Sequence, residues 1–406
     1  MNRGPRPIHL HQTLALNCWQ SALCAWHASK LGWPIWNPSF QNNFATFGAA
    51  RNLPEFPAAL WAEIQSRWTQ FHAGVHQYHQ HPFHRTPSNL PLLWQQGTTR
   101  LFDYGGTGVP LLVIPSLVNR AYILDLLPKK SFLQFLSSQG FRPLLIDWDT
   151  PGDMEKSFGL SEYITQRLLP IYDFICKEFA SAKAEDAPPA VMGYCMGGNL
   201  ALALAQLAAQ QNKNRPPALV LLATAWDFHA PGMPRFTPTM AEQLMQVVTQ
   251  KGELPVDWLQ SFFAALDPFG AVQKFMKFAD MDMHSDRAHL FVALEDWLSD
   301  GVPLTPRVAR ETMQDWYAFN TPMKNAWRIA DHIINPAALN IPTLAVLPQQ
   351  DRIVSPASAA ALAGLIPGAL SLTPALGHIG MMAGREAQTK VWQPVADWLH
   401  EKARKI

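Results

Sequence analysis

The chain has 406 residues, of which 48% are hydrophobic, and its 32 basic and 31 acidic side chains leave a formal net charge of +1. This balance excludes the strongly basic surface typical of nucleic-acid binding, and the longest apolar runs are shorter than the roughly 20 residues of a membrane-spanning helix. The N-terminus lacks a continuous apolar segment, and the four cysteines form no C-x-x-C pair. We therefore expect a globular cytoplasmic protein with reduced thiols, no secretory signal and no transmembrane segment.

Residues 1–95 are rich in Trp, Phe, His and Pro, and the clearest helical pattern among them covers residues 56–80. There, apolar residues recur at steps of three and four, as on one face of a helix. We predict that residues 1–95 form a helical N-terminal extension. A histidine cluster lies in it, at His72, His76, His79, His81 and His84. No carboxylate or cysteine accompanies these histidines at ligand spacing, so we predict no metal site.

Short apolar runs alternate with helical stretches over residues 96–228. The runs typical of buried strands are 109–117, 141–149, 189–195 and 218–228. Two helical stretches between them cover 130–140, ended by Gly140, and 161–183, opened by Ser161 as N-cap. The alternation predicts βαβ units, and hence an α/β fold with a mostly parallel sheet and helices on both faces.

The strand pattern stops over residues 229–335, where the sequence predicts a helical cap inserted into the α/β core. Its helical stretches are 237–250, 257–266, 288–301 and 305–320. The strand pattern returns at 341–348, and two further helical stretches follow at 356–368 and 387–405. Residues 336–406 are therefore predicted to complete the core that begins at residues 96–228.

The segment "VMGYCMGGNLALALA", residues 191–205, places Cys195 where an apolar strand passes into an Ala/Leu-rich helix. Most α/β-hydrolases carry G-x-S-x-G at such a turn, because the nucleophile adopts a strained conformation between closely packed elements. The positive end of the following helix favours a thiolate. We predict that Cys195 is the nucleophile and that Gly193, Gly197 and Gly198 form the nucleophile elbow.

A thiol nucleophile needs a base held by an acid, and α/β-hydrolases supply them in the chain order nucleophile, acid, base. Asp351 follows the apolar run 341–348 directly, which places it at the carboxyl end of a strand, where sites in open sheets lie. His378 comes later, in "GHIG". We predict that Asp351 and His378 complete a triad with Cys195.

The acyl intermediate also needs backbone N–H donors for its oxyanion. One is expected at Met196, the residue after the nucleophile, and the other in the loop "IPSLVNR" after an early strand. Leu117 or Val118 is the candidate in that loop.

These segments, together with "NRAYILDL" at residues 119–126, resemble the polyhydroxyalkanoate synthases, over about residues 100–228 and 340–385. The resemblance implies an α/β-hydrolase core that polymerises hydroxyacyl-CoA thioesters, such as 3-hydroxybutyryl-CoA, with CoA release. It assigns Cys195 as the acyl-bearing nucleophile, His378 as general base and Asp351 as the acid that orients it. CoA enters as part of the substrate, and no cofactor is implied.

The same resemblance implies a growing polyester chain as a further partner. It also implies a homodimer or a second synthase subunit, and location in the cytoplasm or at polyester granules. Because the net charge is only +1, nucleic acid is not an expected partner.

Two other functions remain open at this stage. A thioesterase or polyester esterase would use the same triad and pass the acyl group to water. A catalytically silent granule-associated paralogue would need no triad, and the presence of both Cys195 and His378 argues against it.

Several side chains have two interpretations. Aromatic residues of the predicted cap either line a dry tunnel or form helix core; they are Phe262, Phe263, Phe269, Phe275, Phe278 and Trp297. Asp147 and Asp227 follow predicted strands, so each is either a site residue or a structural turn residue.

Overall fold

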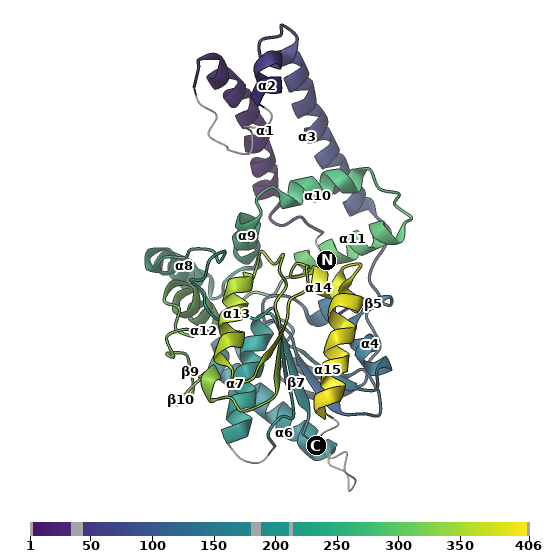
Figure 1. Cartoon of the computed structure of the whole chain (residues 1–406), viewed down its shortest axis with the longest axis vertical. Coiled ribbons are helices and arrows are strands. Elements are labelled where there is room, and N and C mark those ends of the chain that lie inside the picture. Colours follow the sequence, from purple (N-terminus) through teal and green to yellow (C-terminus); the bar gives the residue numbers. More distant parts are fainter. Residues whose placement is uncertain (1–2, 34–43, 180–187, 211–213, 404–406) are drawn as a thin grey trace. The chain divides into compact units, whose positions relative to one another are not determined.

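The computed structural model describes residues 3–33, 44–179, 188–210 and 214–403 (Figure 1). Its chain divides into two compact units. Met1–His84 and Gln260–Ser299 form the helical unit, and Arg85–Leu259 and Asp300–Ile406 form the sheet unit. No helix within the described ranges is long and apolar enough to cross a membrane.

The sheet unit contains an eight-stranded sheet in the order β1-β2-β6-β3-β7-β8-β11-β12. The strands are β1 (Leu92–Gln96), β2 (Thr99–Asp103), β3 (Pro110–Ile114), β6 (Arg142–Asp147), β7 (Ala190–Tyr194), β8 (Leu219–Leu222), β11 (Thr343–Val346) and β12 (Leu370–Leu372). The pairings β1-β2 and β2-β6 are antiparallel, and all the others are parallel. Every residue of β3, β7, β8 and β11 is buried, so both faces of the sheet are covered. The predicted α/β class with a mostly parallel sheet is confirmed.

Helices and short turns connect these strands. The α-helices of the sheet unit are α4 (Phe132–Ser138), α5 (Leu160–Tyr163), α6 (Leu169–Glu178), α7 (Met196–Gln210), α8 (Pro238–Lys251), α12 (Pro306–Ala309), α13 (Pro356–Leu365), α14 (Gly380–Ala383) and α15 (Gln393–Ala403). Three π-helical segments are η4 (Ile164–Leu168), η5 (Arg310–Ala318) and η7 (Gln388–Trp392). The 3-10 turns are η2 (Ala121–Leu124), η3 (Glu155–Ser157) and η6 (Pro336–Ala338). Two small hairpins pair β4 (Asp125–Leu127) with β5 (Lys130–Ser131) and β9 (Arg328–Ile329) with β10 (His332–Ile333).

The predicted helix at 161–183 is correct in type, but its start is wrong. It begins one residue earlier, with Gly159 as the N-cap residue, whose N–H donates to the Glu162 carboxylate at 2.8 Å. Ser161 therefore lies inside the first turn and is not the cap. Residues 180–183 of that prediction lie outside the described residues.

The helical unit is built on α1 (Ile8–Lys30), α2 (Phe44–Ala50), α3 (Phe56–Gln80), α10 (Gly270–Ala279) and α11 (Asp286–Ser299), while α9 (Val256–Leu266) begins in the sheet unit. The bounds of α3 equal those predicted from periodicity. Helices α1 and α3 lie side by side (Figure 1). Helix α3 also packs closely on α10, because a Cβ at Gly74 would collide with the main chain of Phe275.

Aromatic side chains fill the core of the helical unit. Phe275 is fully buried, and its ring lies 5.6 Å from Tyr78 and 5.4 Å from Phe291. Phe278 is also fully buried, which confirms the helix-core interpretation for these two residues of the predicted cap. Residues 260–299 therefore pack with helices from the start of the chain, although the sequence order groups them with residues 229–335.

Candidate active site

Cys195 occupies the junction between β7 and α7. Its φ of 57° lies in the left-handed region, which residues with a side chain seldom adopt. Two hydrogen bonds hold it there: its N–H donates to the Leu222 carbonyl at 2.8 Å, and its carbonyl accepts from Gly198 N–H at 2.9 Å. The sheet and the helix thus both fix the main chain of the predicted nucleophile.

The three glycines around Cys195 lie where no side chain fits. A Cβ at Gly193 would collide with the main chain of Gly197 and Gly198. One at Gly197 would collide with the main chain of Ile114 at the end of β3, and one at Gly198 with the Thr224 side chain. Close packing of strand, turn and helix therefore requires glycine at each position.

Asp351 and His378 meet in space, as their predicted pairing requires. His378 Nδ1 lies 2.7 Å from Asp351 Oδ2, and both side chains are buried. Asp351 follows β11, and its other oxygen accepts the N–H groups of Ile353 at 2.8 Å and Val354 at 2.9 Å. These main-chain bonds fix the carboxylate, which in turn orients the imidazole ring.

His378 is also hydrogen-bonded to the side chain of Cys195, so the three predicted residues form one connected group. Burial acts to lower the pKa of His378, but the charges and hydrogen bonds of Asp351 and Cys195 outweigh burial and raise that pKa to about 10. At neutral pH this arrangement favours an imidazolium beside the sulfur.

Two tyrosines near the group were missed by the sequence analysis. Tyr194 is buried, its hydroxyl donates to the His378 carbonyl at 3.2 Å, and its ring centre lies 5.1 Å from that of His378. Tyr317, at the end of η5, has a raised pKa because of burial and the nearby charges of Cys195 and Asp351. Tyr194 was recognisable as the neighbour of Cys195, whereas no local pattern distinguishes Tyr317.

The loop with Leu117 and Val118 follows β3, where Gly197 packs against Ile114 and Pro115. Val118 N–H donates to Ser116 Oγ at 3.1 Å. The Val118 carbonyl accepts from Val302 N–H at 2.9 Å. The N–H of Val118 is thus already engaged within its own loop.

Asp147 and Asp227 have structural partners. Asp147 forms an ion pair with Arg100 at 2.7 Å. Asp227 accepts hydrogen bonds from Asn320 Nδ2 at 2.8 Å and from His229 N–H at 2.9 Å. These contacts support the structural interpretation of both residues.

The histidines at the end of α3 belong to the helical unit. His79 Nε2 lies 2.8 Å from the Gly4 carbonyl, and His81 Nε2 lies 2.9 Å from the Met283 carbonyl. Throughout the part of the chain that the structure describes, no group of three His, Cys, Asp or Glu side chains is arranged to hold a metal ion.

Comparison with known proteins gives the family. A family model for the alpha/beta hydrolase fold matches residues 109–384. The poly(3-hydroxyalkanoate) polymerase subunit PhaC of Haloferax mediterranei is 26% identical over 79% of this chain and 65% of its own length. The subunit of the same name from Synechocystis sp. is 29% identical over 72% of this chain and 78% of its own length.

The resemblance predicted from the sequence motifs is therefore confirmed by similarity over most of the chain. Among solved structures, a thermophilic esterase from Thermogutta terrifontis (malate bound) has a TM-score of 0.47 and 18% identity, covering 75% of this chain and 94% of the esterase. The family model, together with the mostly parallel sheet, shows that this chain belongs to the alpha/beta hydrolase fold family.

Proposed function

We propose that this protein is an acyltransferase of the polyhydroxyalkanoate synthase type, which joins hydroxyacyl units from CoA thioesters into polyester. The observation that carries the proposal is a cysteine at the strained elbow position, hydrogen-bonded to a histidine that an aspartate orients. The names of the relatives, poly(3-hydroxyalkanoate) polymerase subunits, support the same conclusion.

In the proposed first step, the Cys195 thiolate attacks the thioester carbonyl of a 3-hydroxyacyl-CoA. The oxyanion accepts hydrogen bonds from the N–H groups of Met196 and Leu117; Val118 is the weaker candidate because its N–H already donates to Ser116. The C–S bond to CoA then breaks, and His378 gives its proton to the leaving thiolate. The products are an acyl-Cys195 thioester and free CoA.

In the proposed second step, the hydroxyl of another hydroxyacyl unit attacks the acyl-Cys195 carbonyl. His378 accepts the hydroxyl proton, an ester bond forms, and the Cys195 thiolate leaves. Asp351 acts by holding the imidazole in one orientation throughout.

A thiol suits these two reaction steps because CoA donors are thioesters. Exchange of one thioester for another keeps the acyl group activated, and a thiolate leaves readily when the next hydroxyl attacks. A serine would store the chain as a less reactive ester. The cysteine therefore favours transfer over hydrolysis, which is the alternative use of the same triad.

We also propose that the protein works with a second copy or a second subunit, at the surface of polyester granules. The relatives are themselves named as subunits of a polymerase, which supports a multi-chain enzyme.

The deciding experiment incubates the purified protein with 3-hydroxybutyryl-CoA and measures CoA release, product size and the mass of the peptide that contains Cys195 after acid quenching. High-molecular-weight polyester and an acylated Cys195 peptide are the expected results. Monomeric acid with the same acylated peptide would indicate the hydrolase instead. CoA release without acylation of Cys195 at any time point would overturn the proposed nucleophile.

A further inference from the structure

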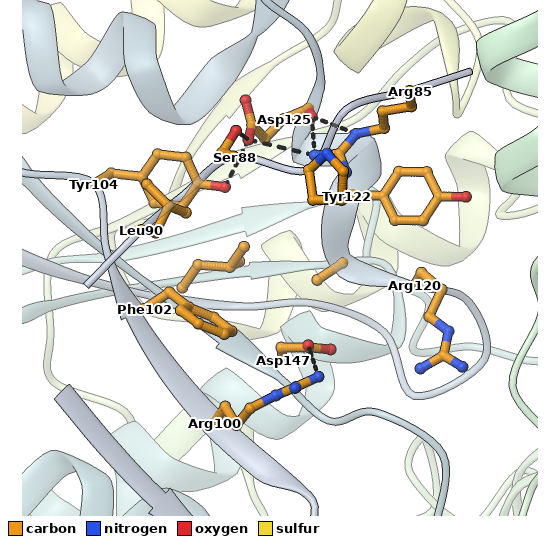
Figure 2. Close-up of a pocket in the computed structure, with 13 residues that line it drawn as sticks. Arg85, Ser88, Leu90, Arg100, Phe102, Tyr104, Arg120, Tyr122, Asp125 and Asp147 are labelled. Carbon is orange, nitrogen blue, oxygen red and sulfur yellow. Dashed lines mark hydrogen bonds and ion pairs between the residues drawn. The ribbon is translucent and has the colours of Figure 1, made fainter. Parts of the chain in front are cut away.

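A cavity of about 280 Å³ lies in the sheet unit beside β2 and β6 (Figure 2). Its volume is close to the lower end of small-molecule pockets, which range over about 300 to 1,000 Å³. The cavity is thus large enough for one part of a ligand such as CoA. Three arginines and two aspartates contribute to its lining.

Part of the cavity lining lies at the same edge of the sheet as the catalytic group. Arg100 pairs in register with Asp147, the last residue of β6, and the carboxyl ends of β6 and β7 share one edge. Three strand spacings separate β2 from β7, which is roughly 15 Å. Arg120 comes two residues after Val118 of the candidate oxyanion loop. A ligand with a long flexible arm can therefore reach Cys195 from this cavity.

The two aspartates of the lining are already neutralised. Asp125 accepts from Ser88 Oγ at 2.6 Å and Tyr104 OH at 2.9 Å, and it lies 3.5 Å from Arg85. Asp147 is paired with Arg100. Asp149, which lies next to the lining, pairs with Arg100 at 2.8 Å and with Arg120 at 2.6 Å, so Arg85 is the lining arginine whose guanidinium faces a single carboxylate.

The three arginines differ in the donors that they have left. Arg85 donates Nε and Nη2 to the Asp125 carbonyl, at 3.3 and 2.9 Å, and no described residue accepts from its Nη1. Arg100 Nε is buried and has no hydrogen-bond partner in the described part of the chain. Arg120 differs, because Asp149 and Thr150 already accept from its two terminal nitrogens. Because the Nε of Arg100 is buried and its Nη2 donates to both Asp147 and Asp149, Arg85 is the arginine with an N–H group left for an anionic ligand.

The remaining walls are aromatic and apolar. Phe102 lies two residues from Arg100 on β2 and so shares its face of the sheet. The Arg85 guanidinium lies 4.6 Å from the centre of the Tyr122 ring. Figure 2 shows Arg85 and Tyr122 on one side of the cavity and Arg100 with Asp147 on the other. A flat heterocycle fits between such surfaces, because purines stack on aromatic rings and guanidinium planes.

We propose that this cavity binds the adenosine phosphate end of the CoA thioester. The purine lies against Phe102 and Tyr122, Arg85 donates to a phosphate oxygen, and the pantetheine arm leads the thioester along the sheet edge to Cys195. This inference rests on the proposed function for its substrate, but it concerns the recognition of the nucleotide and not the chemistry.

The first test compares two substrates in steady-state kinetics: 3-hydroxybutyryl-CoA and the 3-hydroxybutyryl thioester of N-acetylcysteamine, which has no nucleotide. For Arg85→Gln we expect KM for the CoA thioester to rise about tenfold with little change in kcat, because the lost contact holds ground state and transition state equally. The truncated thioester should keep its kinetic constants. Equal effects on both substrates, or on neither, would overturn the proposal.

The control variant is Arg142→Gln. Arg142 begins β6, at the opposite end of the strand from Asp147, and it pairs with Asp103 at 2.6 Å. Its side chain is 30% exposed, compared with 33% for Arg100 and 17% for Arg85. We expect this substitution to leave KM unchanged for both thioesters.

A second measurement uses the wild-type protein, and its calorimetric part needs no turnover. Titration of the wild-type protein with adenosine 3′,5′-bisphosphate in a calorimeter should give saturable binding, and this ligand should compete with the CoA thioester but not with the truncated one. If neither thioester reacts, the proposed function fails while the calorimetry still decides this inference. Absence of saturable binding overturns the inference even if polyester forms.

Discussion

The helical unit and the sheet unit hold their key residues by different interactions. In the helical unit, Phe275 and Phe278 are fixed by contacts with other rings, which are numerous and individually weak. In the sheet unit, Cys195 and Asp351 are fixed by main-chain hydrogen bonds and by glycines that admit no side chain. Substitutions should therefore change chemistry in the sheet unit and stability in the helical unit.

The largest effect is expected for Cys195→Ala. Loss of the nucleophile should reduce CoA release from 3-hydroxybutyryl-CoA by about a millionfold, to the assay background. Cys24→Ala, which removes an exposed thiol of the helical unit, is the control and should leave the rate unchanged. A Cys195→Ala protein with more than a few per cent of wild-type turnover would show that another residue carries the acyl group.

Asp351→Ala should reduce turnover by about 10,000-fold, because the imidazole loses its orienting partner. It should also change the titration of the His378 imidazole. In the wild type, the pKa of His378 is raised to about 10, so the imidazolium persists from pH 6 to 8. Without Asp351, burial lowers that pKa, and the imidazole should then lose its proton at a lower pH.

The measurement for Asp351→Ala is the titration of the His378 imidazole, followed by NMR of protein with isotope-labelled histidine from pH 5 to 11. His378→Gln is the control, because it identifies the His378 signal by its absence. A wild-type His378 that loses its proton between pH 6 and 8 would contradict the imidazolium assignment.

Phe275→Ala should lower the free energy of unfolding by about 3 to 5 kcal/mol, because it leaves a cavity among α3, α10 and α11. Alkylation of Cys195 at 25 °C should keep its wild-type rate. Phe269→Ala is the matched control, since that ring is 41% exposed, and it should cost less than about 0.5 kcal/mol. Urea unfolding followed by tryptophan fluorescence measures both variants.

The smallest effect is expected in the sheet unit, for Glu311→Gln in η5. Burial raises the pKa of Glu311 to about 7, although its bond with Leu160 N–H and the charge of Arg307 oppose this. The folded state therefore holds the proton more tightly than the unfolded state, and stability should fall as the pH rises through 7. Glutamine cannot ionise, so the variant should lose about 2 kcal/mol less stability than the wild type between pH 5 and pH 8.

Urea midpoints at pH 5 and pH 8 test this prediction. Glu242→Gln, on an exposed position of α8, should leave the pH dependence as in the wild type. If Glu311→Gln and the wild type lose equal stability between the two pH values, Glu311 is already ionised at pH 5.

Local patterns in the sequence were sufficient for most of the sheet unit. The buried runs predicted its central strands, and the glycine spacing around Cys195 predicted the elbow. The chain order of Asp351 and His378 predicted residues that the structure brings within hydrogen-bond distance. Each of these signals depends on neighbours in the sequence or on a conserved order of elements in the fold.

Features that depend on distant contacts were not predictable. The prediction of Ser161 as N-cap was wrong because Gly159 and Glu162 form the cap. Glu311, far along the chain, accepts a hydrogen bond from the N–H of Leu160, the first residue of the helix. The packing of α10 on α3 joins segments about 200 residues apart, so periodicity in either helix could not reveal it. The cavity at Arg85 likewise required the three-dimensional arrangement of β2 and β6.

The left-handed backbone at Cys195 sets a limit on how stable this protein can become. A side chain in that conformation destabilises the folded state by about 1 to 3 kcal/mol, and a glycine would relieve the strain while removing the sulfur. Selection for heat resistance alone would thus favour loss of the nucleophile. A cysteine at this φ indicates that the residue is retained for its chemical function, although glycine would make the folded state more stable.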